Sequence, residues 1–119
     1  LSMPYLGYCK KEDTLYQHTR SFILSHHNPY YYQGTCASGI GSPHTSKNYI
    51  WHIALSMQGL TGTKEEAKKM INLILETSNN EGLCHEGFNK DEPSEYTRFW
   101  FAWANSLFAE LVYQTYFVK

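Results

Sequence analysis

The chain has 119 residues, a length that suits one domain or part of one. Its 10 basic and 11 acidic residues nearly balance and form no basic stripe, which argues against nucleic acid as a partner. No segment approaches the roughly 18 continuous apolar residues of a membrane-spanning helix. The 42% hydrophobic content supplies enough apolar material for a core and argues against disorder.

Two features of the composition bear on the kind of site. Aromatic residues make up 16% of the chain, which suits a partly apolar, solvated cleft. A core built from large rings explains the same figure, and composition alone favours the core. Cys9, Cys36 and Cys84 lack the spacing of a metal site or a disulfide framework, so we expect free, buried thiols and no metal.

The first half of the chain predicts two helices. The first is expected over about 14–25, where a Thr-x-x-Gln spacing suits a capping box and Asn28-Pro29 follows the last turn. The second is expected to begin near Ser42 or Thr45, because Ser42 before a proline is a good helix start.

The second half predicts two more helices. Thr63 and Glu66 form a capping box before a clear amphipathic pattern that ends at 79–82. A last helix is expected from about Thr97 to Tyr116. It is apolar all round at its start, a pattern typical of a helix buried on every side. Few neighbours in a chain this short can bury it, which suggests that packing partners lie outside the chain.

The arrangement of these helices predicts the fold class. The four helices alternate with two long loops, over about 28–45 and 80–96, in which polar and aromatic residues gather. Helical hairpins with functional loops at one end indicate an all-α fold, either an α/α toroid or an α-solenoid. No clean internal repeat is present, which disfavours a regular solenoid.

Glu86 is the first candidate for chemistry. It lies in a glycine-flanked, aromatic-rich loop beside His85, where a carboxylate within reach of a water can act as a general base. Most acidic residues are only solvated, so local context does not decide its role. Arg98 can clamp a substrate hydroxyl or carboxylate, although spacing alone favours an ion pair with a nearby acid: Asp91, Glu92 or Glu95.

The segment 39–45 is the second candidate. Its two glycines allow a ligand to approach the backbone, and Ser42, His44 and Thr45 offer hydroxyl and imidazole groups. No Gly-Lys-Ser/Thr follows, so it is not a phosphate-binding loop. The alternative is a helix start that needs glycines for its turn, and the spacing favours that alternative.

Six phrases in this order resemble glycoside hydrolase family 125, which contains exo-acting α-1,6-mannosidases. They cover nearly the whole chain: PYLGY at 4–8, TR with LS at 19–25, NPYY at 28–31, GIGSPHT at 39–45, HEGF at 85–88 and TRFWFAWAN at 97–105. The sequence departs from the family pattern at Gly87, where the family has Ser, and at His52 and Phe99, where it has Pro. None of these departures removes a charged group.

The resemblance implies an (α/α)6 barrel, of which residues 1–119 would be the carboxy-terminal part within a single catalytic domain. Twelve helices of about 12 residues with loops of about 6 need roughly 216 residues. Four helices supply about a third of such a barrel. We accordingly interpret the opening Leu1-Ser2 as a truncation.

The resemblance also implies an inverting exo-α-1,6-mannosidase that acts on terminal mannose of oligosaccharides or N-glycans, without metal or cofactor. Glu86 corresponds to the family's general base, whereas no residue here can be matched to the general acid, which lies upstream. The residues expected to line the mannose site are Ser42, His44, His85, Arg98 and Trp100.

Other functions stay open at this point. We expect the isolated chain to be inactive because its acid is missing. The main alternative is a non-catalytic helical carbohydrate-binding module or an inactive fragment of an enzyme. A helical scaffold is a third, which the long aromatic loops disfavour. The sequence does not predict compartment or oligomeric state.

Overall fold

The computed structural model describes all residues, 1–119, and contains four helices and five short strands. In chain order the elements are α1 (Thr14–Ile23), β1 (Tyr31–Gln33), β2 (Ser38–Ile40), β3 (Tyr49–Trp51), α2 (His52–Leu60), α3 (Lys64–Thr77), β4 (Gly87–Asn89), β5 (Tyr96–Thr97) and α4 (Ala102–Tyr116). The predicted all-α class, a partial (α/α)6 barrel, is therefore wrong for this chain, because two antiparallel sheets make it mixed α/β.

The strands lie in segments that were expected to be loops or helix. β1 and β2 form a two-stranded sheet, and β3, β4 and β5 form a three-stranded sheet in that order. In the larger sheet Ile50 lies opposite Phe88, and Phe88 lies opposite Tyr96. Strands of two or three residues are too short to show an alternating pattern, and the pairing of Ile50 with Phe88 joins residues far apart in the sequence.

The start of α2 differs from the prediction for a visible reason. Ser42 does not cap a helix, because its Oγ accepts a hydrogen bond at 3.1 Å from the backbone N–H of His44 in a turn. Tyr49–Trp51 then pairs with Gly87–Asn89 as β3 and β4, so the helix begins only at His52. Long-range sheet pairing here overrides the local helix-start signal.

The other helix boundaries follow the prediction more closely. In α3, Thr63 Oγ1 accepts from the Glu66 backbone N–H at 3.1 Å, so half of the predicted capping box forms. In α1 the N-cap is Asp13, and its side chain makes no capping hydrogen bond. The last helix begins at Ala102, and this chain alone does not bury its start on every side, because Trp103 is 71% exposed.

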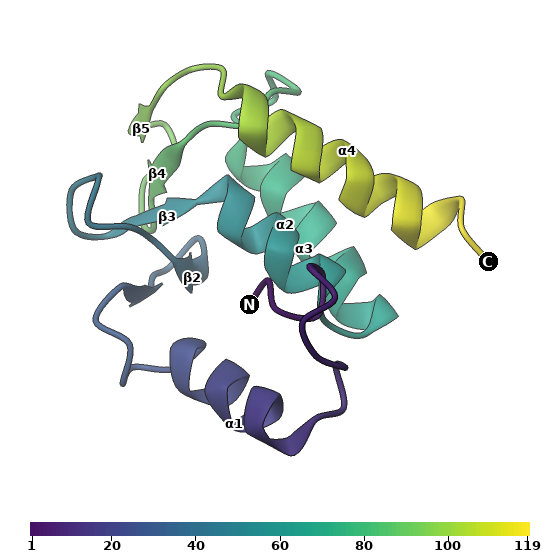
Figure 1. Cartoon of the computed structure of the whole chain (residues 1–119). Coiled ribbons are helices and arrows are strands. Elements are labelled where there is room, and N and C mark those ends of the chain that lie inside the picture. The colour runs from purple at the N-terminus through teal and green to yellow at the C-terminus, as the bar shows by residue number, and fades with distance from the viewer.

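The core lies among α2, α3 and α4, with the three-stranded sheet at one end of these helices (Figure 1). Close packing of α2 on α4 requires Gly59, since a Cβ there would lie 2.8 Å from Leu111 Cδ1. Ile50 and Phe88 bring the sheet into the same cluster. No helix is both long and apolar enough to cross a bilayer. The three cysteines are unpaired, and only Cys84 has the predicted burial.

α1 lies apart from the other helices (Figure 1), and one buried arginine ties it to them. Arg20 is 8% exposed, and its guanidinium donates to Thr61 Oγ1 at 2.8 Å and to the Gln58 carbonyl at 3.2 Å. It also forms an ion pair with Glu66 Oε2 at 2.7 Å. The Glu66 side chain thus serves Arg20 instead of closing the reciprocal half of its capping box.

His52 is fully buried at the start of α2 between His85 and Phe88, with ring centroids 5.5 and 4.7 Å away. Burial first, and the neighbouring His85 second, lower the pKa of His52 from 6.5 to about 3. The imidazole of His52 is therefore neutral in the folded chain at neutral pH.

We expect the chain's stability to fall as pH drops from 6.5 toward 3 because of His52. Within that window the unfolded state binds a proton that the folded state does not, so this contribution is complete above pH 6.5 and is lost on acidification. The limiting slope for one such group is about 1.4 kcal/mol per pH unit. Urea unfolding across this range measures it. A His52→Asn variant with the same slope would contradict the assignment.

Candidate active site

The backbone that carries Glu86 is held at several successive residues. Cys84 N–H donates to Asn105 Oδ1 at 3.0 Å, and the Cys84 carbonyl accepts from Phe101 N–H at 3.0 Å. Glu86 N–H donates to the Thr97 carbonyl at 3.1 Å. One residue on, Gly87 N–H donates to Thr97 Oγ1 at 3.1 Å. The segment is therefore fastened to β5 and to the first turns of α4.

His85, between Cys84 and Glu86, is hydrogen-bonded to the first residue of α2. Its backbone N–H donates to Nδ1 of His52 at 2.9 Å. Its own ring is fully buried and stacks on Tyr96 at 3.9 Å. The ring Nδ1 contacts the Phe99 carbonyl at 2.9 Å, and Nε2 lies 3.4 Å from Asn79 Nδ2. The carbonyl can only accept, so Nδ1 carries the proton. Both ring nitrogens are thus engaged inside the chain.

Glu86 itself is mostly buried and paired through one oxygen. Its side chain is 17% exposed, and Oε2 accepts from Arg98 Nε at 3.1 Å, whereas Oε1 makes no hydrogen bond within the chain. The expectation that Arg98 pairs with Asp91, Glu92 or Glu95 is wrong, since Glu86 is its partner. Arg98 is 63% exposed, so this is a solvent-accessible pair with one carboxylate oxygen unoccupied.

The backbone of Arg98 is unusual. Its φ of +52° lies in the left-handed region, which residues other than glycine and asparagine rarely adopt. This turn follows directly after β5 and directs the chain toward α4. Sparsely populated backbone conformations of this kind persist where the surrounding structure requires them. Here the requirement is the Thr97 pairing on one side and the Cys84–Phe101 hydrogen bond on the other.

Aromatic rings connect Arg98 to the segment 39–45. The guanidinium carbon lies 5.8 Å from the Phe101 ring centroid, within cation–π range. Phe101 meets Trp51 edge-on at 6.1 Å. Trp51 Nε1 in turn donates to Thr45 Oγ1 at 2.9 Å, and its ring lies 6.4 Å from that of His44. The two glycine-containing phrases of the sequence are thus brought to one region through Trp51.

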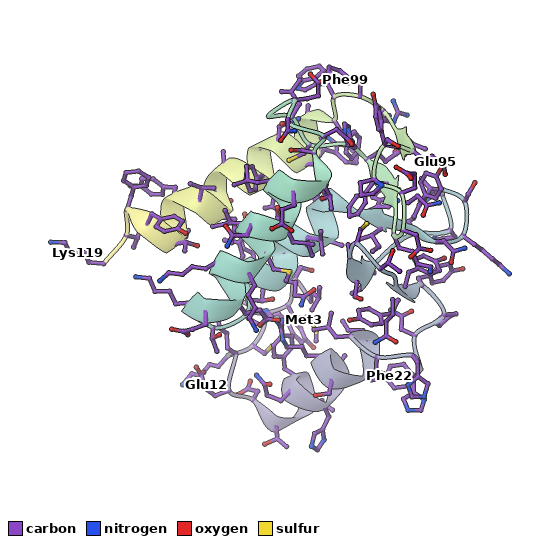
Figure 2. The ribbon with its side chains drawn as sticks, turned by 180° about the vertical axis from the view of Figure 1, so that it is seen from behind. Met3, Glu12, Phe22, Glu95, Phe99 and Lys119 are labelled. Carbon is purple, nitrogen blue, oxygen red and sulfur yellow. The ribbon has the colours of Figure 1, made fainter.

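The remaining predicted residues have different surroundings. Ser42 supports its turn, as described above, and His44 is exposed. Trp100 is 60% exposed. Its neighbour Phe99 lies just before α4, at the opposite end of that helix from Lys119 (Figure 2). Of the predicted set, Glu86, Arg98 and His44 are therefore linked by contacts. His85 lies beneath the surface, and Trp100 stands in solvent.

Sequence reasoning missed three residues that shape this region: Trp51, Thr97 and Phe101. Phe101 and Thr97 lie within the phrase quoted at 97–105, but nothing in that phrase distinguishes them from their neighbours. Trp51 is a large aromatic residue outside the quoted phrases, and the role of Thr97 depends on the register in which β5 meets Gly87. At Gly87 a Cβ would lie 3.2 Å from Trp51 Cδ1 and Nε1, so a larger residue there would require the indole ring to move slightly.

Three cavities of the chain lie away from this region. Three hollows of about 520, 390 and 320 Å³ are lined by other residues, and Glu86 borders none of them. The largest lies at the other end of α2 and α4, beside Gly59 and Glu110. We place the candidate site by its paired carboxylate and converging aromatic rings, since volume alone carries no chemistry. The Glu86 side chain is 17% exposed and lies beside the largely exposed side chain of Arg98.

Two observations describe what else the region contains. No three His, Cys, Asp or Glu side chains come together in the arrangement of a metal site. Burial raises the pKa of the Cys84 thiol to about 12, so this cysteine stays protonated at neutral pH. A protonated thiol is a poor nucleophile, so Cys84 is not a candidate for chemistry in this region.

Comparison with known proteins agrees with the resemblance of the motifs. The sequence pattern of the family described as "Metal-independent alpha-mannosidase (GH125)" matches residues 1–113. The "Meiotically up-regulated gene 157 protein" of Schizosaccharomyces pombe is 41% identical over 114 residues, which are 94% of this chain and 22% of that protein.

A solved structure gives the same result. It is a metal-independent α-mannosidase of Streptococcus pneumoniae in a non-productive complex with α-1,6-mannobiose. It is 50% identical, with a TM-score of 0.94, and the match covers 96% of this chain and 27% of that one. The chain thus spans about a quarter of the length of these relatives. The chain belongs to glycoside hydrolase family 125, the metal-independent α-mannosidases.

Proposed function

We propose that this chain forms part of an inverting exo-α-1,6-mannosidase that releases terminal mannose from oligosaccharides such as N-glycans, with Glu86 as the general base. The observation that carries the proposal is the Glu86 carboxylate, which is mostly buried, held at 3.1 Å by Arg98 and free at Oε1. The complex of the Streptococcus pneumoniae relative with α-1,6-mannobiose supports the choice of sugar.

In this mechanism Glu86 removes a proton from a water molecule. The water oxygen forms a bond to the anomeric carbon on the face opposite the leaving group. The bond to the glycosidic oxygen breaks, and that oxygen keeps the electron pair and takes a proton from a carboxylic acid about 6.5–9.5 Å from the base. No residue of this chain is assigned as the acid. We propose that it comes from outside residues 1–119.

We propose that the sugar contacts come from the exposed groups around Glu86. Arg98 keeps unpaired guanidinium N–H groups that suit sugar hydroxyls. His44, Ser42 and Trp100 complete the proposed mannose site. For His85, the buried and hydrogen-bonded ring favours a supporting place below the sugar over direct contact.

The test is the stereochemistry of hydrolysis by the full-length protein. We expect ¹H NMR of a reaction with α-1,6-mannobiose to show β-mannose first, followed by slow mutarotation, because a single displacement inverts the anomeric carbon. The isolated 119 residues should release no mannose under the same conditions. If α-mannose forms first, Glu86 is not acting as a base on water. Turnover by the isolated chain would show that both catalytic groups lie within it.

A carbohydrate-binding role without catalysis is the second candidate. The ion pair between Glu86 and Arg98 favours it, because one carboxylate oxygen is already occupied and Glu86 borders none of the three hollows described above. Calorimetry with α-1,6-mannobiose distinguishes the two. Binding by the full-length protein without any release of mannose supports the second candidate and excludes the first.

A further inference from the structure

We propose that His52 is a positioning residue that sets the orientation of Glu86 through the backbone N–H of His85. The inference rests on the proposed role of Glu86 as general base. At position 52 this sequence departs from the family pattern, which has proline there.

The hydrogen bonds of His52 run in one defined direction. Its Nδ1 lies 2.9 Å from the His85 backbone nitrogen, and a backbone N–H can only donate, so Nδ1 is the acceptor. The ring proton is therefore on Nε2, which donates to Thr77 Oγ1 at 2.9 Å. The Thr77 hydroxyl donates onward to the Leu73 carbonyl at 2.7 Å. This chain of bonds ties the residue before Glu86 to the last turns of α3.

Burial makes the arrangement rigid. His52 and His85 are both fully buried, and the imidazole of His52 is enclosed between the His85 ring at 5.5 Å and the Phe88 ring at 4.7 Å. These two residues flank Glu86 and Gly87, so the ring contacts both ends of the short segment. The low pKa of His52, about 3, keeps Nδ1 available as an acceptor at neutral pH.

The His85 N–H has no other acceptor in the chain. A buried N–H that loses its partner is unfavourable, so the segment would shift until the group found a substitute. Glu86 is the next residue and would move with it. Misplacement of a catalytic group by about 1 Å can cost on the order of 100-fold in rate.

Two substitutions test the two hydrogen bonds of the His52 ring separately. In His52→Asn an amide oxygen lies near the place of Nδ1 and can accept from His85 N–H, while the bond to Thr77 is lost. In His52→Gln the longer side chain reaches toward Thr77 and the acceptor for His85 is lost. Thr77→Val is the matched control, because it breaks the far end of the same chain of bonds.

In the full-length protein with α-1,6-mannobiose, we expect His52→Gln to lower kcat by about 100-fold with KM within about twofold. His52→Asn should keep kcat within about fivefold, and Thr77→Val should lower the melting temperature without lowering kcat. In a Glu86→Gln background, His52→Gln should cause no further loss, because it acts through Glu86. Equal losses of kcat in the two His52 variants, in step with their melting temperatures, would overturn the proposal.

A measurement on the unmodified protein applies even where a variant does not fold. The two nitrogens of the critical bond both belong to histidines, so ¹⁵N-histidine labelling should show a scalar coupling between the His85 amide nitrogen and His52 Nδ1. Absence of that coupling contradicts the inference. If Glu86→Gln alone keeps full activity, the proposed function fails. In that case slower exchange of the His85 amide in His52→Asn than in His52→Gln still supports the link to the segment, and equal exchange overturns it.

Discussion

Glu86→Gln in the full-length protein is expected to lower kcat on α-1,6-mannobiose by about 10³-fold with KM nearly unchanged. An amide has the shape of the carboxylate but cannot accept the proton of the attacking water. The loss corresponds to about 4 kcal/mol of transition-state stabilisation. Folding should change little, because the ion pair that is lost joins Glu86 to a largely exposed Arg98. Initial rates of mannose release measure the effect.

The matched control is Glu95→Gln. This carboxylate is exposed and accepts a hydrogen bond from Asn89 Nδ2 at 3.1 Å, on the turn between β4 and β5. It lies next to the same sheet but outside the candidate site, so kcat should stay at the unmodified value. If the Glu86→Gln variant retained more than about a tenth of the activity, the Glu86 side chain would be a loop carboxylate and not the general base.

Arg20→Ala is expected to destabilise the chain by about 3 kcal/mol and to release α1 selectively. The change leaves Glu66, Thr61 Oγ1 and the Gln58 carbonyl without the cation that joins them. α1 buries only Tyr16 and Arg20, so little else holds it against α2 and α3. Hydrogen exchange should show fast exchange over Thr14–Ile23 while α2 to α4 stay protected.

His18→Ala provides the comparison for this effect. The His18 side chain is exposed on the same helix and makes none of these contacts. The free energy of unfolding and the amide exchange rates of the variant should therefore match those of the unmodified protein. Uniform loss of protection across all four helices in Arg20→Ala would show that α1 belongs to the same cooperative unit as the core. Unchanged protection of α1 would show that its attachment does not depend on the arginine.

The helices were predictable because their signals are local. The capping residue Thr63 and the apolar stripe of α3 lie within one segment, and both are found where expected. The strands were not predictable, because each is only two or three residues long, and one pairing, that of Tyr49–Trp51 with Gly87–Asn89, joins segments far apart in the sequence. The same pairing displaced the expected start of α2.

For the candidate site, individual residues were predictable and their contacts were not. Glu86 and Arg98 were both singled out, but their ion pair depends on the turn that brings β5 back along β4. His52 offered no signal for a supporting role, since a histidine on an apolar helix face has no partner that spacing can identify. The burial of His85 likewise depends on Tyr96 and Asn79, which the sequence does not place beside it.

The anchoring of residues 84–87 has a consequence for any future variant series. The segment is tied at once to positions 52, 97 and 105, on three separate elements. These bonds hold the backbone of the segment, so a change at any one of the three positions is expected to disturb the backbone that carries the carboxylate. Distance from Glu86 along the chain is then a poor guide to which substitutions are harmful. A replacement at position 52 or 105 is expected to affect the position of the carboxylate about as much as one at position 85.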